Sequence, residues 1–298
     1  MLDNRYMSTH VDDVFYTSSD GLQLYCRHYA AQEKAGAQPV LCLPGLTRNS
    51  RDFAALAAHL SRKRDVFAAD LRGRGRSQWD PHPSRYQLAT YVQDAWYFLD
   101  SRGIDRVFIV GTSLGALMGM AMAAEVPRRI AGVVMNDAGP ELDPVGLRRI
   151  AGYAGKLPPV TSWPAAAAQA KSVYGAALPD LDESGWVAYA RAAYREDGSG
   201  MPTPDMDPKI AEAFNQTAAA PADLWPLFAR TREVPLLVIR GALSDILSGA
   251  TVARMAREHP HLEHIEVLNR GHTPLLDEPP CLAAIDAFLE RSPPTSAQ

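Results

Sequence analysis

The chain has 298 residues, a formal net charge of −4, 47 % hydrophobic residues and 21 % charged residues, which are ordinary values for a globular protein. Acidic and basic residues are interspersed, so no basic stripe indicates nucleic-acid binding and no basic amphipathic segment indicates binding to a membrane surface. Charged residues near the N-terminus, among them Asp3 and Arg5, argue against the apolar core of a signal peptide, and we expect a cytoplasmic protein.

Two strand-like runs open the chain, and Asp20-Gly21 between them is a strong turn signal, so we predict an antiparallel hairpin of Val11–Thr17 and Leu22–Tyr29. Strand patterns and helix patterns then alternate, which predicts a mostly parallel sheet with helices on both faces. The predicted strands of this part are Pro39–Leu43, Val66–Ala69, Val107–Val110 and Ile130–Met135, and the predicted helices are Ser50–Leu60, Tyr86–Asp100 and Ala116–Ala124.

The pattern changes after Gly139, because residues 140–228 contain no strong strand pattern. Helical segments broken by Pro and Gly occur there instead, at Pro164–Tyr174, Ser184–Tyr194 and Pro208–Gln216. Strand and helix patterns resume at Pro235–Arg240, Gly249–Glu258, His264–Leu268 and Pro280–Glu290. We therefore predict a core domain of residues 1–139 and 229–292 and a helical cap insertion of residues 140–228, with a disordered tail from Ser292.

The sequence Gly111-Thr112-Ser113-Leu114-Gly115 follows a buried strand pattern and opens a helix pattern. A Gly-x-Ser-x-Gly turn of this kind strains the serine backbone and lifts its hydroxyl above the edge of the sheet. The free N–H groups at the start of the helix favour negative charge that develops beside it. Ser113 is therefore a candidate nucleophile.

A nucleophilic serine needs a base within hydrogen-bond reach, and the base needs an acid that orients it. Asp245 follows the strand Pro235–Arg240, and His272 follows the strand His264–Leu268. Loops after parallel strands share one edge of the sheet, which is where Ser113 also lies. We predict Asp245 as the acid and His272 as the base, and Asp137 at the end of Ile130–Met135 is the alternative acid.

Over nearly its whole length the sequence resembles the α/β-hydrolase superfamily. The matching pieces are Leu43-Pro44-Gly45-Leu46, the stretch from Asp70 to Ser77, the Gly-x-Ser-x-Gly turn, Asp245 and Gly271-His272. The resemblance implies a mostly parallel eight-stranded sheet with helices on both faces, a cap, and an oxyanion hole made by the backbone N–H groups of Leu46 and Leu114. Pro44 is a departure, because the family usually has His before the oxyanion glycine.

Further residues are candidates for the substrate pocket. Arg48, just past the oxyanion loop, could pair with a substrate carboxylate, although a solvated arginine at a helix start is the alternative. Tyr153, Trp163 and Trp186 could line the pocket or pack inside the cap. Arg72, Arg74 and Arg76 could bind phosphate, but the family resemblance favours a structural loop.

These residues favour hydrolysis of a small-molecule carboxylic ester or lactone through an acyl-enzyme. A C–C hydrolase of ring-fission products, a cofactor-free perhydrolase and a non-catalytic ligand receptor are the alternatives. No cofactor and no metal is implied: the three cysteines, Cys26, Cys42 and Cys281, lack metal or redox spacing, and we expect buried free thiols. We expect no nucleic-acid or membrane partner, and the sequence is compatible with a homo-oligomer.

Overall fold

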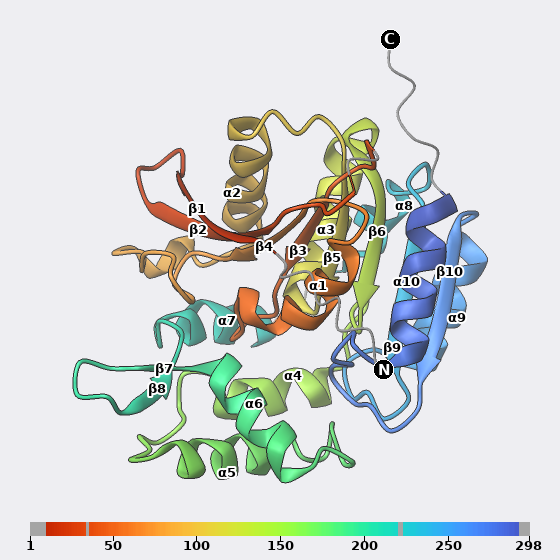
Figure 1. Ribbon diagram of the computed structural model, residues 1–298. Coiled ribbons are helices and arrows are strands. Elements are labelled where there is room, and N and C mark those ends of the chain that lie inside the picture. The colour runs from red at the N-terminus through yellow and green to blue at the C-terminus, as the bar shows by residue number, and fades with distance from the viewer. Residues whose placement is uncertain (1–9, 34–35, 220–222, 292–298) are drawn as a thin grey trace, which may run out of the picture.

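Eight strands form one twisted sheet across the centre of the molecule, as Figure 1 shows. The computed structural model describes residues 10–33, 36–219 and 223–291. The strand order is β1-β2-β4-β3-β5-β6-β9-β10; β2 pairs antiparallel with β1 and β4, and the other neighbours pair in parallel. The strands are β1 Val11–Thr17, β2 Gln23–Tyr29, β3 Val40–Leu43, β4 Val66–Asp70, β5 Val107–Thr112, β6 Ile130–Asn136, β9 Leu236–Gly241 and β10 Leu262–Val267. The predicted eight-stranded, mostly parallel sheet and its opening hairpin are confirmed.

The central strands are continuous apolar runs because both of their faces are covered. All seven residues of β6 are buried. In β5, Ile109 pairs with Leu41 of β3 and with Val133 of β6. Successive side chains of a strand point to opposite faces, so β5 contributes to two separate hydrophobic layers.

Each face of the sheet is covered by its own helices. Ile109 belongs to the layer that contains buried residues of α2 (Leu88–Ser101), α3 (Leu114–Glu125), α8 (Trp225–Ala229) and α9 (Gly249–Glu258). Phe108 belongs to the opposite layer, with α1 (Ala54–Leu60) and α10 (Pro279–Arg291). The short 3₁₀ turn η1 (Ser50–Phe53) leads into α1, so the predicted helix Ser50–Leu60 is split into two pieces.

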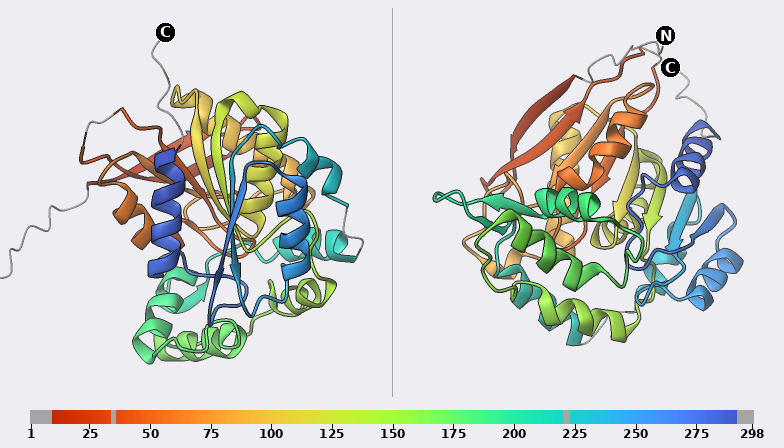
Figure 2. Two further views of the ribbon diagram at one scale, coloured as in Figure 1. Left: turned by 90° about the vertical axis from the view of Figure 1, so that its right-hand side faces the viewer. Right: turned by 60° about the horizontal axis from the view of Figure 1, so that its bottom comes forward.

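Most of residues 140–228, here called the cap segment, lies at the edge of the sheet where the parallel strands end, at the bottom of Figure 1 and in front in the right-hand view of Figure 2. Its elements are α4 Pro144–Tyr153, α5 Trp163–Tyr174, α6 Glu183–Ala193, β7 Tyr194–Glu196, β8 Pro202–Pro204 and α7 Ile210–Ala219, followed by α8. Helices α5 and α6 pack on each other through small residues such as Ala166 and Ala190. The division of the chain into a core domain and a cap domain stays a prediction, and residues 1–9 and the tail from Ser292 lie outside the described residues.

Two features of the cap segment differ from the sequence prediction. Tyr194 begins the small antiparallel hairpin β7–β8 instead of ending a helix. The hairpin turns at residues 197–200, where Asp197 accepts hydrogen bonds from the N–H groups of Ser199 and Met201; turn chemistry of this kind is a signal that the sequence already contains. Phe228 of α8 is buried against the sheet core and not within the cap.

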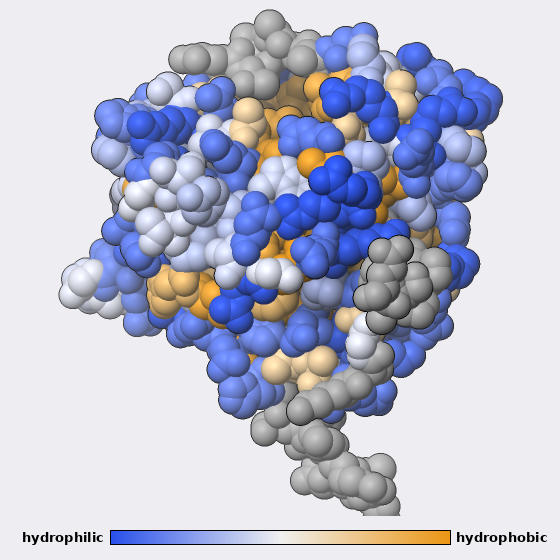
Figure 3. Space-filling view, turned by 90° about the horizontal axis from the view of Figure 1, so that it is seen from above, coloured by the Kyte–Doolittle hydropathy of each residue, from blue (hydrophilic) through white to orange (hydrophobic). Residues whose placement is uncertain are grey.

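The face of the molecule turned away from the cap segment is largely hydrophilic where its residues are described, with only small separate hydrophobic areas (Figure 3). None of the helices in the described ranges combines the length and the apolar character that crossing a membrane requires. The three cysteines are buried and unpaired, as the sequence predicted.

Candidate active site

Ser113 occupies a tight turn between β5 and α3. Its backbone has φ 52° and ψ −109°, a conformation that residues other than glycine rarely adopt. A Cβ atom at Gly111 would overlap the carbonyl of Gly115, and one at Gly115 would overlap the carbonyl of Leu43. The N–H of Ser113 donates to the carbonyl of Asn136 at 2.9 Å. The two glycines therefore allow a close approach that holds the serine in its strained conformation.

His272 lies between Ser113 and a carboxylate. Its Nε2 atom is 2.9 Å from Ser113 Oγ, and its Nδ1 atom is 2.8 Å from Asp137 Oδ2. The side chain of His272 is 6 % exposed and that of Asp137 is fully buried. This arrangement lets Asp137 hold the imidazole in the tautomer that leaves Nε2 free to accept a proton from the serine. The structure thus brings Ser113 and His272 together, as their positions after parallel strands of one sheet suggested.

The acid beside His272 is Asp137 and not Asp245, so the sequence prediction of Asp245 in this position is wrong. Asp245 accepts two hydrogen bonds from Arg149 of α4, at 2.6 and 2.7 Å, and its side chain is one-third exposed. The Arg149 guanidinium holds the pKa of Asp245 below its ordinary value. The physical reason is the path of the loop after β9, which turns Asp245 toward the cap segment while Asp137 stays beside the strand of Ser113.

The end of β9 and the loop after it nevertheless reach the site through two other groups. Gly241 N–H donates to Asp137 Oδ1 at 2.9 Å, and Ser244 Oγ donates to Asp137 Oδ2 at 2.6 Å. With His272, Asp137 therefore has three hydrogen-bond partners, which offset the cost of burying its polar oxygens. Sequence reasoning missed Ser244 and Gly241, because neither position carries a local pattern that marks it.

The oxyanion hole of Leu46 and Leu114 stays a prediction, and the structure places both residues near Ser113. A Cβ atom built on Gly45 would lie 3.7 Å from Ser113 Cβ, which places the loop after β3 directly beside the serine. Leu114 is the first residue of α3. Within the described ranges, neither the Leu46 N–H nor the Leu114 N–H has a hydrogen-bond acceptor. Both groups are therefore free to donate to a substrate oxygen.

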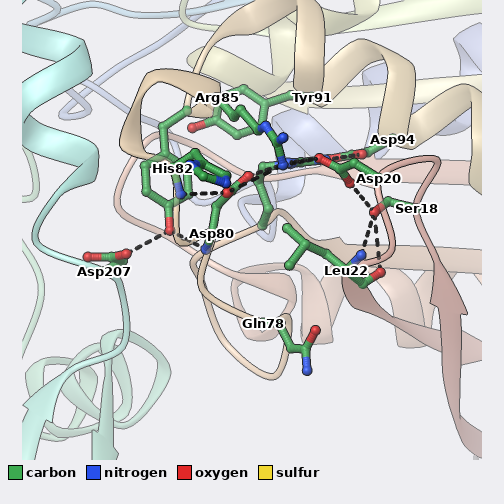
Figure 4. Close-up of polar contacts among 12 residues, drawn as sticks. Ser18, Asp20, Leu22, Gln78, Asp80, His82, Arg85, Tyr91, Asp94 and Asp207 are labelled. Atoms are coloured by element: carbon green, nitrogen blue, oxygen red, sulfur yellow. Dashed lines mark hydrogen bonds and ion pairs between the residues drawn. The ribbon is translucent and has the colours of Figure 1, made fainter.

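Arg74 supports the loop that carries Leu46. The fully buried Arg74 donates from Nε to the carbonyl of Leu46 at 2.8 Å, and from Nη1 to the hydroxyl of Tyr91 at 2.9 Å. Arg72, two residues earlier, is also buried, and it forms ion pairs with the carboxylates of Asp20, Asp80 and Asp94. Figure 4 shows the polar contacts of these three aspartates. These contacts favour the structural interpretation of this arginine-rich loop over phosphate binding.

A cavity of about 430 Å³ is lined by both Ser113 and His272, and a second cavity of about 280 Å³ adjoins it. Four residues line both: Thr47, Arg48, Tyr153 and Tyr174. The larger cavity is closed on the cap side by apolar and aromatic residues of α4 to α6 that the sequence did not single out, namely Ile150, Leu178, Leu181 and Tyr189. Burial raises the pKa values of Tyr153 and Tyr189, so their hydroxyls stay protonated and can donate hydrogen bonds.

Two of the four predicted pocket residues do not line these cavities. Trp186 is 1 % exposed and packs against α5 inside the cap segment. The Arg191 guanidinium lies 3.5 Å above the ring centre of Trp163, and the indole N–H of Trp163 donates a hydrogen bond to Glu196. Tyr189 packs on Trp186, with the ring centres 5.6 Å apart, and lies between it and the cavity that it lines. Among the described residues, no group of three or more His, Cys, Asp or Glu side chains could hold a metal ion.

Comparison with known proteins agrees with this geometry. The α/β-hydrolase fold family model matches residues 38–279. The chain is 31 % identical to a 3-hydroxybutyrate-oligomer hydrolase of Cupriavidus necator, over 86 % of this chain and 89 % of the relative. It is 27 % identical to a 2-(acetamidomethylene)succinate hydrolase of Mesorhizobium japonicum, over 81 % and 84 % of the two chains.

A solved structure gives the same assignment. The crystal structure of an α/β hydrolase from Novosphingobium aromaticivorans is 44 % identical to this chain, covers 95 % of it and 99 % of its own length, and superposes with a TM-score of 0.89. The family match, these relatives and the strand order of the sheet lead to one assignment. This chain belongs to the α/β-hydrolase family.

Proposed function

We propose that this protein is a serine hydrolase that cleaves a small carboxylic ester or lactone through an acyl-enzyme. The observation that carries the proposal is the hydrogen-bonded series Ser113–His272–Asp137 on the wall of a cavity of about 430 Å³. A serine, a histidine and a buried carboxylate in this order form the arrangement that activates a serine hydroxyl for attack on a carbonyl.

In the first step, Ser113 Oγ attacks the carbonyl carbon of the ester while His272 Nε2 takes the hydroxyl proton. The negative charge that develops on the carbonyl oxygen is stabilised by the N–H groups of Leu46 and Leu114. Protonated His272 then gives the proton to the alcohol oxygen, the C–O bond breaks, and the acyl group stays on Ser113. Asp137 stabilises the positive imidazolium during this exchange.

In the second step, a water molecule replaces the alcohol. His272 removes a proton from the water, the water oxygen attacks the acyl carbon, and the same N–H groups stabilise the second intermediate. Ser113 leaves with the proton held by His272, which releases the carboxylic acid and restores the enzyme. One ester and one water are converted to one acid and one alcohol, so the cycle needs no cofactor.

The name of one relative favours an ester over the other substrates of this fold. A 3-hydroxybutyrate oligomer is a chain of ester bonds, and the relative named for hydrolysing it shares most of its length with this chain. A C–C hydrolase, a perhydrolase and a ligand receptor would use the same fold, and the experiment that follows distinguishes the C–C hydrolase by its diketone substrate.

The test uses a serine-directed phosphonate and a substrate panel. We expect the phosphonate to label Ser113, as located by mass spectrometry, and we expect p-nitrophenyl esters or lactones to be hydrolysed while Ser113→Ala is inactive. Ser172→Ala, which changes an exposed serine of α5, is the matched control and keeps full activity. A label elsewhere in an active enzyme would refute the assignment of the nucleophile, and turnover of ring-fission diketones alone would assign C–C hydrolysis instead.

A further inference from the structure

Arg48 lies beside the candidate nucleophile and between the two cavities. It follows the loop of Gly45 and Leu46, and a Cβ atom built on Gly45 would be 3.8 Å from Arg48 Cγ and 3.7 Å from Ser113 Cβ. The Arg48 side chain is 11 % exposed, and the residue lines both cavities. Its guanidinium therefore lies within one small molecule's length of Ser113.

Two of the three guanidinium nitrogens of Arg48 have hydrogen-bond partners within the described part of the chain, and the third does not. Nε and Nη2 donate to the two oxygens of Asp52 at 2.7 and 2.5 Å, and the group lies 4.2 Å above the ring centre of Tyr189. The remaining nitrogen, Nη1, is buried and has no hydrogen-bond partner among the described residues. Leaving a buried charged donor unpaired costs free energy, so an oxygen from outside the chain is the natural partner of Nη1.

The charges around Arg48 favour an anionic partner. Arg51 and Arg195 also line the cavities, and both contact the same carboxylate, Asp205, at 2.5 and 3.6 Å. Together with Arg48 and Asp52 they form a cluster of three arginines and two aspartates, which leaves one positive charge in excess. Asp277, the other carboxyl on the wall of the larger cavity, is not part of this cluster, and burial raises its pKa.

We infer that Arg48 binds a carboxylate of the substrate, so that the enzyme acts on esters of short carboxylate-bearing molecules. The ester carbonyl would lie at Ser113 while the carboxylate reaches Nη1 of Arg48 across a spacer of a few carbons. This inference rests on the proposed function, because it names the substrate class of the same site. Monoesters of short dicarboxylic acids and esters between hydroxy acids have this form.

The test compares ethyl hydrogen glutarate with its neutral isostere, ethyl 5-amino-5-oxopentanoate, by following the release of ethanol. We expect kcat/KM for the acid to exceed that for the amide by at least about tenfold, the effect of one charged hydrogen bond. Arg48→Gln combined with Asp52→Asn, which leaves no orphaned carboxylate, should lower this ratio at least about tenfold. Because both substrates are measured on the same protein, a general loss of activity cancels from the ratio.

The matched control is another arginine with the same local chemistry. Arg254 forms an ion pair with Glu258 four residues later and lies 3.7 Å above the ring centre of Trp225, far from both cavities. Arg254→Gln combined with Glu258→Gln should leave the ratio unchanged. A ratio near one in the unmodified enzyme, or a ratio that survives the change at Arg48, would overturn the inference.

A binding measurement separates this inference from the proposed function. Calorimetry with Ser113→Ala should detect binding of ethyl hydrogen glutarate and at least about tenfold weaker binding of the amide, whether or not the enzyme hydrolyses either ester. If phosphonate labelling and turnover both fail while this preference persists, the proposed function is wrong and the carboxylate site stands. Equal affinity for the two compounds would refute the carboxylate site, even in an active esterase.

Discussion

Asp137 and Asp245 both follow a parallel strand, β6 or β9, yet they have opposite surroundings. Asp137 is fully buried, has φ 56° and contacts His272, Ser244 and Gly241. Asp245 is one-third exposed and contacts Arg149 of the cap segment. A position directly after a strand therefore does not decide which carboxylate hydrogen-bonds to the histidine. The direction of the following loop and the presence of buried hydrogen-bond donors decide it.

The loop after β9 contributes to both surroundings. Gly241, the last residue of β9, and Ser244 of the loop both face Asp137, whereas Asp245, directly after Ser244, faces outward to α4. Two consecutive residues therefore point in opposite directions: Ser244 contacts Asp137 in the candidate site, and Asp245 contacts Arg149 of the cap segment. Substitutions at Asp137, Ser244 and the Arg149–Asp245 ion pair should therefore have very different effects on activity and stability.

Substitution of the two aspartates themselves should have the largest effect on activity. We expect Asp137→Asn to lower kcat for an ester about 10⁴-fold, the loss seen when the orienting acid of a comparable triad is replaced. Asp245→Asn should lower kcat less than about tenfold, because Asp245 does not contact His272. Steady-state kinetics on both variants, with circular dichroism as a check on folding, measure the difference; a crippled Asp245→Asn beside an active Asp137→Asn would reverse our assignment.

Substitution of Ser244 should have the next largest effect, because its side chain connects the loop after β9 to Asp137 after β6. Ser244→Ala removes the donor to Asp137 Oδ2, and a hydrogen bond to a charged group contributes roughly 1.5–3 kcal/mol. We expect kcat to fall about tenfold or more with little change in KM, since Ser244 does not line either cavity. Ser248→Ala, which changes the cap of α9 in the same part of the chain, should leave kcat unchanged.

The Arg149–Asp245 ion pair should matter for stability and little for chemistry. Both side chains are one-third exposed, so solvent screens the pair and its contribution is about 1 kcal/mol or less. A double-mutant cycle of Arg149→Gln and Asp245→Asn, followed by urea unfolding, measures the coupling. A coupling of several kcal/mol would mean that the pair is a structural anchor of the cap segment and not a surface contact.

The same cycle has a defined pH dependence, which is the smallest effect. Arg149 lowers the pKa of Asp245 in the folded chain, so folding favours the ionised carboxylate. The stabilisation is fully present above the ordinary aspartate pKa of about 4, and it is lost as the pH falls through the lower folded pKa. We expect the coupling at about pH 6 to shrink toward zero at about pH 2; an increase on acidification would contradict the assigned ion pair.

The sequence alone was sufficient for the sheet, because its information is local. Apolar runs such as Val107–Val110 are typical of buried strands in a parallel sheet, and the glycines around Ser113 permit the tight strand-to-helix turn. His272 could be found in the same way, since it follows a strand and the chain order of the family places a histidine there. The strands and the turn thus follow from the pattern of neighbouring residues, and His272 follows from that pattern together with the family resemblance.

Only the tertiary structure decided which groups complete the site. The choice between Asp137 and Asp245 depends on how two loops pass each other, and hydrogen bonds such as Leu243 N–H to Arg270 O set that path between residues distant in the chain. The cavity wall depends on helix rotation within the cap segment, where Tyr189 faces the site while Trp186 faces α5. Such outcomes follow from packing between elements, which no local pattern in the sequence encodes.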